Sequence, residues 1–199
     1  MSELPILIVA GFGRCGTTLM MHMLRAGGFA CVGQSPAFEP DQMLPGSVDL
    51  KWLFQQSGRA VKWIDPQRTA LNQNTFTGRR PIIIHMTRDA RQQAKSQVKM
   101  LASDGSVTPN RSMIRAMASS IERDRPKLDK LLNAVGRHVY SFSFEWILSD
   151  PQSAADKVRL IIDTEFDQLF DSAKAATVPI NRSADCAANM DIELAMLGH

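Results

Sequence analysis

A glycine-rich segment near the start of the chain contains the residues best suited to chemistry, Gly11-Phe-Gly-Arg-Cys-Gly-Thr-Thr18. It follows an apolar run and precedes a helical pattern, so its backbone N–H groups are expected to bind phosphate at the positive end of a helix. A Walker loop places a lysine directly before its Ser or Thr. Here Thr17 follows Gly16 directly, and the cation is Arg14, two residues before that glycine. The segment therefore predicts a cradle for an anionic nucleotide without γ-phosphoryl chemistry.

Two other interpretations of this segment fit the rest of the sequence less well. Gly11, Gly13 and Gly16 have the spacing of a dinucleotide fingerprint, which also requires an acidic residue about 20 residues further on, at the end of the second strand. Glu39 lies in a proline-rich loop instead, and the next predicted strand begins near Ala60. A nucleoside-triphosphate loop would need the missing lysine and an aspartate after an apolar strand to bind Mg²⁺. We therefore favour an anion site with hydroxyl donors in the first helical turn.

A second candidate anion site follows the apolar strand pattern Pro81–Thr87. Arg88 comes at the carboxyl end of this strand, where open α/β sheets bind ligands, and Ser96 lies about two helical turns further along. An arginine binds phosphate oxygens bidentately, and a serine hydroxyl adds one hydrogen bond. Arg88 could instead pair with Asp89, and Ser96 could be an exposed helical serine. The two residues and their spacing alone leave these alternatives open.

Both segments resemble the donor site of the sulfotransferases. Residues Gly13–Thr18 are similar to the 5′-phosphosulfate loop of that family, usually written (K/R)SGTT, with Cys15 in place of the usual serine. Arg88 and Ser96 are similar to the pair that holds the donor's 3′-phosphate in the family. A third segment, Ser141–Pro151, resembles the family phrase YEDLLxDP and is given no catalytic role.

The resemblance implies a sulfotransferase that uses 3′-phosphoadenosine 5′-phosphosulfate (PAPS), with no required metal. Such an enzyme moves a sulfuryl group to a hydroxyl or amine and releases 3′-phosphoadenosine 5′-phosphate (PAP). The resemblance makes Arg14 a catalytic residue, because its charge would neutralise the bridging oxygen as the sulfuryl group leaves. Arg182 is similar in place to a basic loop that closes over the 3′-phosphate. The implied donor-binding residues are Gly13, Arg14, Cys15, Gly16, Thr17, Thr18, Arg88, Ser96 and Arg182.

The residue that accepts the proton of the acceptor is harder to assign. Cytosolic sulfotransferases place a histidine in a KTHLP segment, but the similar segment here, Val61–Pro66, has Ile64 at that position. Other branches use a glutamate in the loop after the first motif, and Glu39 is similarly placed. The resemblance therefore implies Glu39 as the catalytic base, with Asp65 as the second candidate. Lys62 either lines the site or is exposed on one face of its strand.

The elements that must position these residues alternate between short β-rich runs and longer helical patterns. The expected strands are Ile6–Ala10, Ala60–Ile64, Pro81–Thr87 and His138–Phe144, and the expected helices include Thr17–Ala26, Ala90–Leu101 and Gln152–Thr164. Continuous apolar strands are typical of parallel sheets covered on both faces. We expect an α/β fold, a three-layer αβα arrangement around a central, mainly parallel sheet of about four to five strands.

Two further segments carry predictions of their own. Pro126 is expected to divide Arg111–Val135 into two helices. The loop Val32–Ser47 is expected to face the acceptor.

Composition limits the classes of function further. Residues 1–199 are expected to form one sulfotransferase-like domain, and a net charge of +3 without long basic runs argues against nucleic-acid binding. No export signal or long apolar segment is visible, and three widely spaced cysteines suit a cytoplasmic protein without membrane contact. The four histidines lack the spacing of a metal site. The expected partner is a small-molecule, glycan or peptide acceptor, and the alternative functions are a catalytically inactive PAP-binding protein and a P-loop nucleotide kinase.

Overall fold

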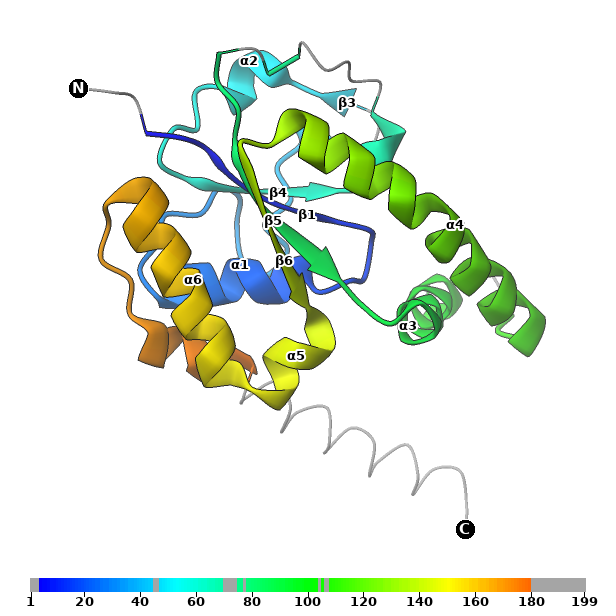
Figure 1. Cartoon of the computed structure of the whole chain (residues 1–199). Helices are drawn as coiled ribbons and strands as arrows, with labels where there is room; N and C mark the ends of the chain where they lie inside the picture. The colour runs from blue at the N-terminus through cyan, green and yellow to red at the C-terminus, as the bar shows by residue number, and fades with distance from the viewer. Residues whose placement is uncertain are drawn as a thin grey trace.

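Four parallel strands form the central sheet, in the order β4, β1, β5, β6 (Figure 1). The computed structural model describes residues 4–44, 47–69, 75–76, 78–103, 105 and 108–179. The strands are β1 (Leu7–Gly11), β4 (Ala60–Ile64), β5 (Ile82–Thr87) and β6 (His138–Ser143), and a separate antiparallel pair contains β2 (Met43–Leu44) and β3 (Ser47–Val48). The helices are α1 (Thr17–Ala26), α2 (Leu50–Leu53), α3 (Ala90–Ser103), α4 (Arg111–Val135), α5 (Phe144–Ser149) and α6 (Pro151–Phe166), with a short 3₁₀ helix η1 (Pro66–Arg68). In the described part of the chain, no helix combines the length and apolar character needed to cross a membrane.

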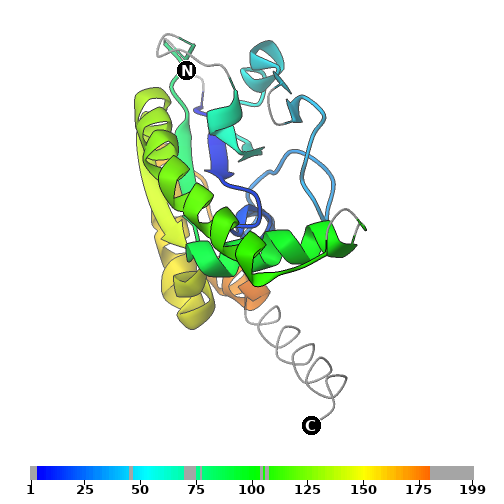
Figure 2. The same cartoon turned by 90° about the vertical axis from the view of Figure 1, so that its right-hand side faces the viewer.

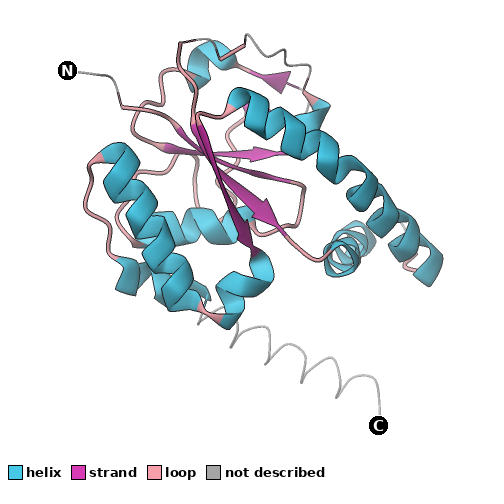
Figure 3. Cartoon of the chain, in the orientation of Figure 1, coloured by secondary structure: helices cyan, strands magenta, loops and turns pink. Residues whose placement is uncertain are grey.

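Helices cover both faces of the sheet (Figure 1, Figure 3). Successive side chains of a strand point to opposite faces, and β1 shows this directly. Leu7 and Val9 belong to the hydrophobic cluster that contains side chains of α1 and α6, whereas Ile8 and Ala10 belong to the cluster with α3 and α4. All five residues of β1 are buried, as expected for a strand between two layers of helices. The predicted three-layer αβα fold with a parallel sheet is confirmed.

The helix α4 continues through Pro126, so the prediction of two helices in this segment is wrong. Proline has no N–H to donate to the carbonyl four residues earlier, which belongs to Glu122. Both residues are exposed, so water can bind that carbonyl oxygen. Ile121 and Leu128, on either side of the proline, are buried. Their burial contributes about 3–6 kcal/mol, which offsets the cost of about 3 kcal/mol for a proline inside a helix.

The carboxyl ends of β1, β4 and β5 meet at one edge of the sheet. Gly11 at the end of β1 pairs with Ile64 at the end of β4, and β5 lies on the other side of β1. The residues that follow these three ends are the loop 12–16, Asp65 and Arg88. Ligands of open parallel sheets bind at this edge. The fold therefore brings to one place three segments that the sequence analysis had singled out.

Candidate functional site

The loop between β1 and α1 contains residues in the left-handed region of backbone space. Arg14 has φ 68° and Gly16 has φ 106°. A Cβ at Gly16 would lie 2.7 Å from Cδ2 of the Phe144 ring, so a larger residue does not fit without displacing that ring. Gly16 directly precedes α1 and has no side chain that could cap the helix. The first N–H groups of α1 have no acceptor within the helix, so they can bind an anion at its positive end.

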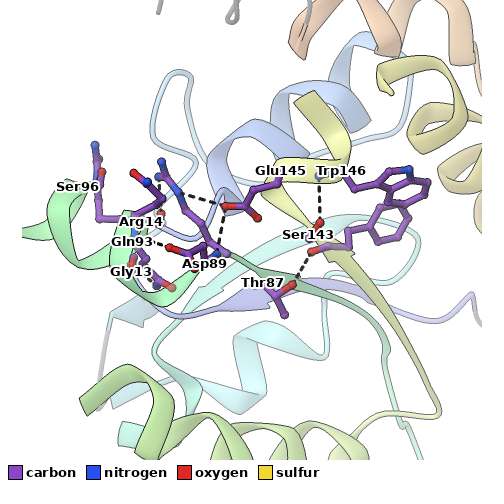
Figure 4. A network of polar contacts seen from close by, with 12 residues as sticks. Gly13, Arg14, Thr87, Asp89, Gln93, Ser96, Ser143, Glu145 and Trp146 are labelled. Carbon is purple, nitrogen blue, oxygen red and sulfur yellow. Dashed lines mark hydrogen bonds and ion pairs between the residues drawn. The ribbon is translucent and has the colours of Figure 1, made fainter. Parts of the chain in front are cut away.

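The backbone of Gly13 is held from two directions, and Figure 4 shows Gln93 of α3 beside it. Its N–H donates to Asp65 Oδ1 at 3.2 Å. Its carbonyl accepts from Gln93 Nε2 at 2.8 Å and from Gln97 Nε2 at 2.9 Å. Asp65 thus supports, from the end of β4, the loop between β1 and α1, which is called the phosphate loop below after the function predicted for it. Neither glutamine was predicted from the sequence, although their spacing of four residues on a helix that follows Arg88 places them on one face.

Arg14, Arg88 and Ser96, which the sequence analysis assigned to the donor site, lie together. Arg14 Nε donates to Ser96 Oγ at 3.1 Å, and Arg88 Nη1 donates to the carbonyl of Arg14 at 3.2 Å. The guanidinium carbon of Arg88 lies 4.3 Å from the centroid of the Phe144 ring, a cation–π contact that orients the side chain. Glu145 Oε1 lies 4.0 Å from Arg88 Nε, a contact that the sequence analysis missed. The structure therefore gathers two guanidinium groups and a hydroxyl beside the phosphate loop.

Lys62 is the buried cation of the site. Its side chain is 2% exposed, and its Nζ donates to Thr18 Oγ1 at 2.7 Å and to the carbonyl of Ala37 at 2.8 Å. It also donates to Glu39 Oε1 at 2.6 Å, forming an ion pair. All three hydrogens of the ammonium group are thereby used. Because Thr18 Oγ1 accepts one of them, its own proton is directed elsewhere, which suits donation to an anion. The alternative of an exposed strand lysine is wrong.

Glu39, the predicted base, lies in a loop that is anchored from inside. The ring of the neighbouring Phe38 is fully buried, and its centroid lies 4.9 Å from that of His22 in an edge-on arrangement. The side chain of Glu39 is 48% exposed, and Lys62 binds its Oε1. Its second oxygen can therefore reach a ligand in the pocket that Glu39 lines. The expectation that the loop Val32–Ser47 faces the acceptor stays a prediction.

Cys15 is buried within the phosphate loop. It is 1% exposed, and burial raises the pKa of its thiol to about 12. A Cβ at Gly11 would collide with its Sγ, which shows how closely the thiol packs against the end of β1. A thiol with this pKa stays protonated at neutral pH and is a poor nucleophile. Cys15 therefore packs the loop from inside and does not act as a reactive cysteine.

These side chains line a pocket of about 590 Å³ at the carboxyl edge of the sheet, called the anion pocket below. Its polar lining includes Arg14, Thr17, Thr18, Glu39, Lys62, Arg88 and Ser96. Small-molecule sites have volumes of about 300–1,000 Å³, so the pocket is large enough for a nucleotide. Arg182 lies outside the described residues, and its role stays a prediction. Among the residues that the structure describes, no group of three or more His, Cys, Asp or Glu side chains could hold a metal ion.

Solved structures of other proteins have a similar fold. The match to a sulfotransferase from Alicyclobacillus acidocaldarius has a TM-score of 0.53 and covers 86% of this chain and 85% of that protein, at 15% sequence identity. The chain has the sulfotransferase fold. Mouse sulfotransferase SULT7A1 complexed with PAP matches this chain with a TM-score of 0.54 and 14% identity, over 90% of this chain and 64% of the mouse protein. No protein-family model and no curated protein matches the sequence, so the likeness to the sulfotransferase fold rests on structure.

Proposed function

We propose that this protein is a sulfotransferase that takes its sulfuryl group from PAPS. The observation that carries the proposal is the meeting of two anion-binding groups in the anion pocket. PAPS is negatively charged at two separate points, the 5′-phosphosulfate and the 3′-phosphate. The phosphate loop and the start of α1 bind the first, and Arg88 with Ser96 binds the second. The sulfotransferase fold, and the PAP bound to the mouse protein of that fold, support this assignment.

The residues of the anion pocket divide the chemistry among them. The N–H groups at the start of α1 and the hydroxyls of Thr17 and Thr18 hold the 5′-phosphosulfate. An acceptor oxygen attacks the sulfur while the bond from sulfur to the bridging phosphate oxygen breaks, and the electron pair leaves with PAP. Arg14 and Lys62 place positive charge where negative charge grows on that bridging oxygen. Glu39 accepts the proton of the acceptor.

A PAP-binding protein without turnover is the second candidate, and one observation favours it. Cys15 stands where the sulfotransferase loop has a serine, and its thiol is buried in the loop. The phosphosulfate would therefore bind without the hydroxyl that the usual serine supplies. A nucleotide kinase is less well supported, because the buried cation comes from Lys62 on β4 and not from a lysine of the phosphate loop.

Calorimetry with PAP, and with ATP plus Mg²⁺, tests the class of donor. We expect PAP to bind more tightly. Arg88→Ala should weaken PAP binding by about tenfold to a hundredfold, because a hydrogen-bonded charge is lost, while adenosine 5′-phosphosulfate, which lacks the 3′-phosphate, should be much less affected. Arg91→Ala is the matched control, since Arg91 is an exposed arginine in the first turn of α3. Tighter binding of ATP than of PAP would refute the proposal.

A transfer assay with labelled PAPS and pooled alcohols, phenols and amines tests turnover. Glu39→Gln should retain PAP binding and lose transfer, because an amide cannot accept the proton. Retained transfer would remove Glu39 from its role and leave Asp65 as the carboxylate to be replaced next. A wild-type protein that binds PAP and transfers to none of the acceptors would favour the second candidate.

A further inference from the structure

A groove of about 470 Å³ lies between α3 and α4 and is called the basic groove below. The two helices pack against each other, and α4 is the long helix that crosses the front of the molecule in Figure 2. Arg91 and Lys95, four residues apart on α3, line the basic groove, whereas Ser96 and Met100, with the same spacing, line the anion pocket. Residues four apart share one face of a helix. The two spaces therefore lie against different faces of α3.

The basic groove is lined almost entirely by cations. Its lining residues are Arg91, Lys95, Arg111, Ile114 and Arg115, and the four cationic ones are exposed. In the part of the chain that the structure describes, no hydrogen bond or ion pair engages the side chain of any of these four. Elsewhere cations pair with nearby acids, as Lys127 does with Asp124 and Lys174 with Asp171. The basic groove thus concentrates positive charge in a chain whose net charge is only +3.

Two of the four cations stand where a helix favours the opposite charge. Arg91 is the second residue of α3 and Arg111 is the first residue of α4, and neither helix has an acidic residue in its first turn. The start of a helix carries partial positive charge, so a cation there is repelled. Lys95 and Arg115, one turn further along each helix, add to the same positive field. An anion in the basic groove would relieve this repulsion, because it would lie beside four cations and the starts of two helices.

The number and type of the cations favour a ligand with several phosphate groups. A phosphate ester carries about 1.5–2 negative charges near neutral pH, so about two or three phosphates match four cations. A ligand that used carboxylates would need about four of them in the same space. Three of the four cations are arginines, whose planar guanidinium groups bind phosphate oxygens bidentately.

The lining of the basic groove argues against a larger partner. Among the described residues that line it, Ile114 is the one apolar residue and none is aromatic. The core of a protein–protein interface is rich in apolar and aromatic side chains. Proteins that bind single-stranded nucleic acid stack its bases on aromatic rings. The basic groove offers neither, so a compact anion fits it best.

We propose that the basic groove is a second anion site, which binds a compact ligand with two or more clustered phosphate groups. The site is separate from the one proposed for the donor, and the inference does not rest on the proposed sulfotransferase function. Clustered phosphates occur on soluble oligophosphates and on phosphorylated lipid headgroups, and both present the same chemistry to the four cations. The ligand stabilises the folded protein, because only the folded chain brings α3 and α4 together.

Inorganic tripolyphosphate is the soluble probe of the basic groove. At low ionic strength, where exposed charges are least screened, calorimetry should detect its binding, and the thermal unfolding midpoint should rise in its presence. Arg115→Gln should weaken this binding by about fivefold or more. The variant should fold normally, because it removes one of four like charges from an exposed position. Arg123→Gln is the matched control, since Arg123 is an exposed arginine of α4 that lies outside the groove and contacts Asp124.

The anion pocket is the other place where tripolyphosphate could bind. Excess PAP and the Arg88→Ala substitution each disfavour binding there, and the binding that depends on Arg115 should persist in both conditions. If Arg115→Gln binds tripolyphosphate as the wild type does, or if Arg88→Ala abolishes the binding, the proposal is overturned. The PAP dissociation constant of Arg115→Gln should stay within about twofold of the wild-type value. Failure of this inference would therefore leave the donor assignment intact, and a protein that does not bind PAP would still allow the groove to be tested.

Vesicles distinguish the two sources of clustered phosphate. The protein is sedimented with phosphatidylcholine vesicles that either contain or lack phosphatidylinositol bisphosphate. Binding to the first kind that falls for Arg115→Gln, and not for Arg123→Gln, would identify a lipid headgroup as the ligand. Binding of tripolyphosphate alone would identify a soluble oligophosphate. Absence of Arg115-dependent binding in both experiments would overturn the proposal, as would tighter Arg115-dependent binding of a polyglutamate peptide, which would assign the groove to an acidic protein.

Discussion

Replacing Lys62 with methionine tests the centre of the site, because methionine keeps the length of the side chain and removes the ammonium group. Thr18 Oγ1 and the carbonyl of Ala37 lose their donor, which costs about 1 kcal/mol for each hydrogen bond. The ion pair with Glu39 contributes at most about 1 kcal/mol, because that carboxylate is 48% exposed and can turn to water. The free energy of unfolding should therefore fall by about 2–3 kcal/mol.

The same substitution should affect transfer more than stability. If Lys62 helps to neutralise the bridging oxygen, its loss should lower kcat by about a hundredfold to a thousandfold. Urea unfolding followed by far-UV circular dichroism measures the first effect, and labelled PAPS with an acceptor from the pooled compounds measures the second. Lys51→Met, at an exposed position on α2, is the matched control and should change the free energy of unfolding by less than about 0.5 kcal/mol.

Two results would refute this reasoning separately. If Lys62→Met unfolds at the same urea concentration as the wild type, the three hydrogen bonds do not stabilise the fold as described. If the variant is folded and its kcat is unchanged, the ammonium group does not act on the leaving oxygen. Comparing Lys62→Met, Glu39→Gln and the double variant would then show whether the pair is energetically coupled.

Gly16→Ala should lower the thermal unfolding midpoint and weaken PAP binding, because a φ of 106° strains alanine and its Cβ would meet the ring of Phe144. Gly28→Ala is the control, since Gly28 has φ 94° and a Cβ there would meet nothing within 4 Å. This variant should show only the part of the fall in midpoint that comes from backbone strain. Gln97→Ala should weaken PAP binding in calorimetry by about fivefold, the equivalent of one hydrogen bond to the phosphate loop, whereas exposed Gln92→Ala should not. Burial lowers the pKa of His85 from its usual 6.5, so the unfolded chain takes up a proton more readily. The part of the free energy of unfolding that depends on neutral, buried His85 is therefore fully present above about pH 6.5 and is lost as the pH falls below that value. Urea unfolding of His85→Gln, measured at several pH values, should lack this part of the pH dependence. Equal falls in the unfolding midpoint for Gly16→Ala and Gly28→Ala would contradict the first of these predictions. An unchanged PAP affinity of Gln97→Ala would contradict the second. Identical pH profiles of stability for His85→Gln and the wild type would contradict the third.

The sequence predicts those parts of the site that depend on a single segment. The phosphate loop Gly11–Thr18 is recognisable because glycines and hydroxyls between a strand and a helix have few backbone solutions. Arg88 and Ser96 are recognisable because an arginine after a similar strand, with a serine eight residues later, resembles the 3′-phosphate pair of the sulfotransferases. Three of the four strands, β1, β4 and β5, are predicted from apolar runs, which follow from burial on both faces of a parallel sheet. The edge strand β6 is less apolar, and only Phe142 in it is buried. In each case the signal is local. The structure confirms the strands and places Arg88 and Ser96 in one pocket with the loop after β1, while their binding of phosphate stays a prediction.

The parts that were not predicted depend on packing between distant segments. Lys62 and Glu39 are 23 residues apart, and their contact depends on how buried Phe38 anchors the loop. Gln97 binds the phosphate loop 84 residues away in sequence, and nothing in its local pattern distinguishes it from an exposed helical glutamine. The continuous α4 depends on whether the carbonyl freed by Pro126 faces water, which only the packed helix decides.

The three hydrogen bonds at the backbone of Gly13 also have a consequence for the time course of the proposed donor binding. A loop that is already held by side chains from β4 and α3 needs no slow ordering step when the nucleotide arrives. Rates of association then depend on diffusion and on attraction between opposite charges. Stopped-flow traces with PAP should show one phase whose rate rises linearly with concentration. A single linear phase would show that the phosphate loop is a fixed part of the scaffold rather than a moving lid.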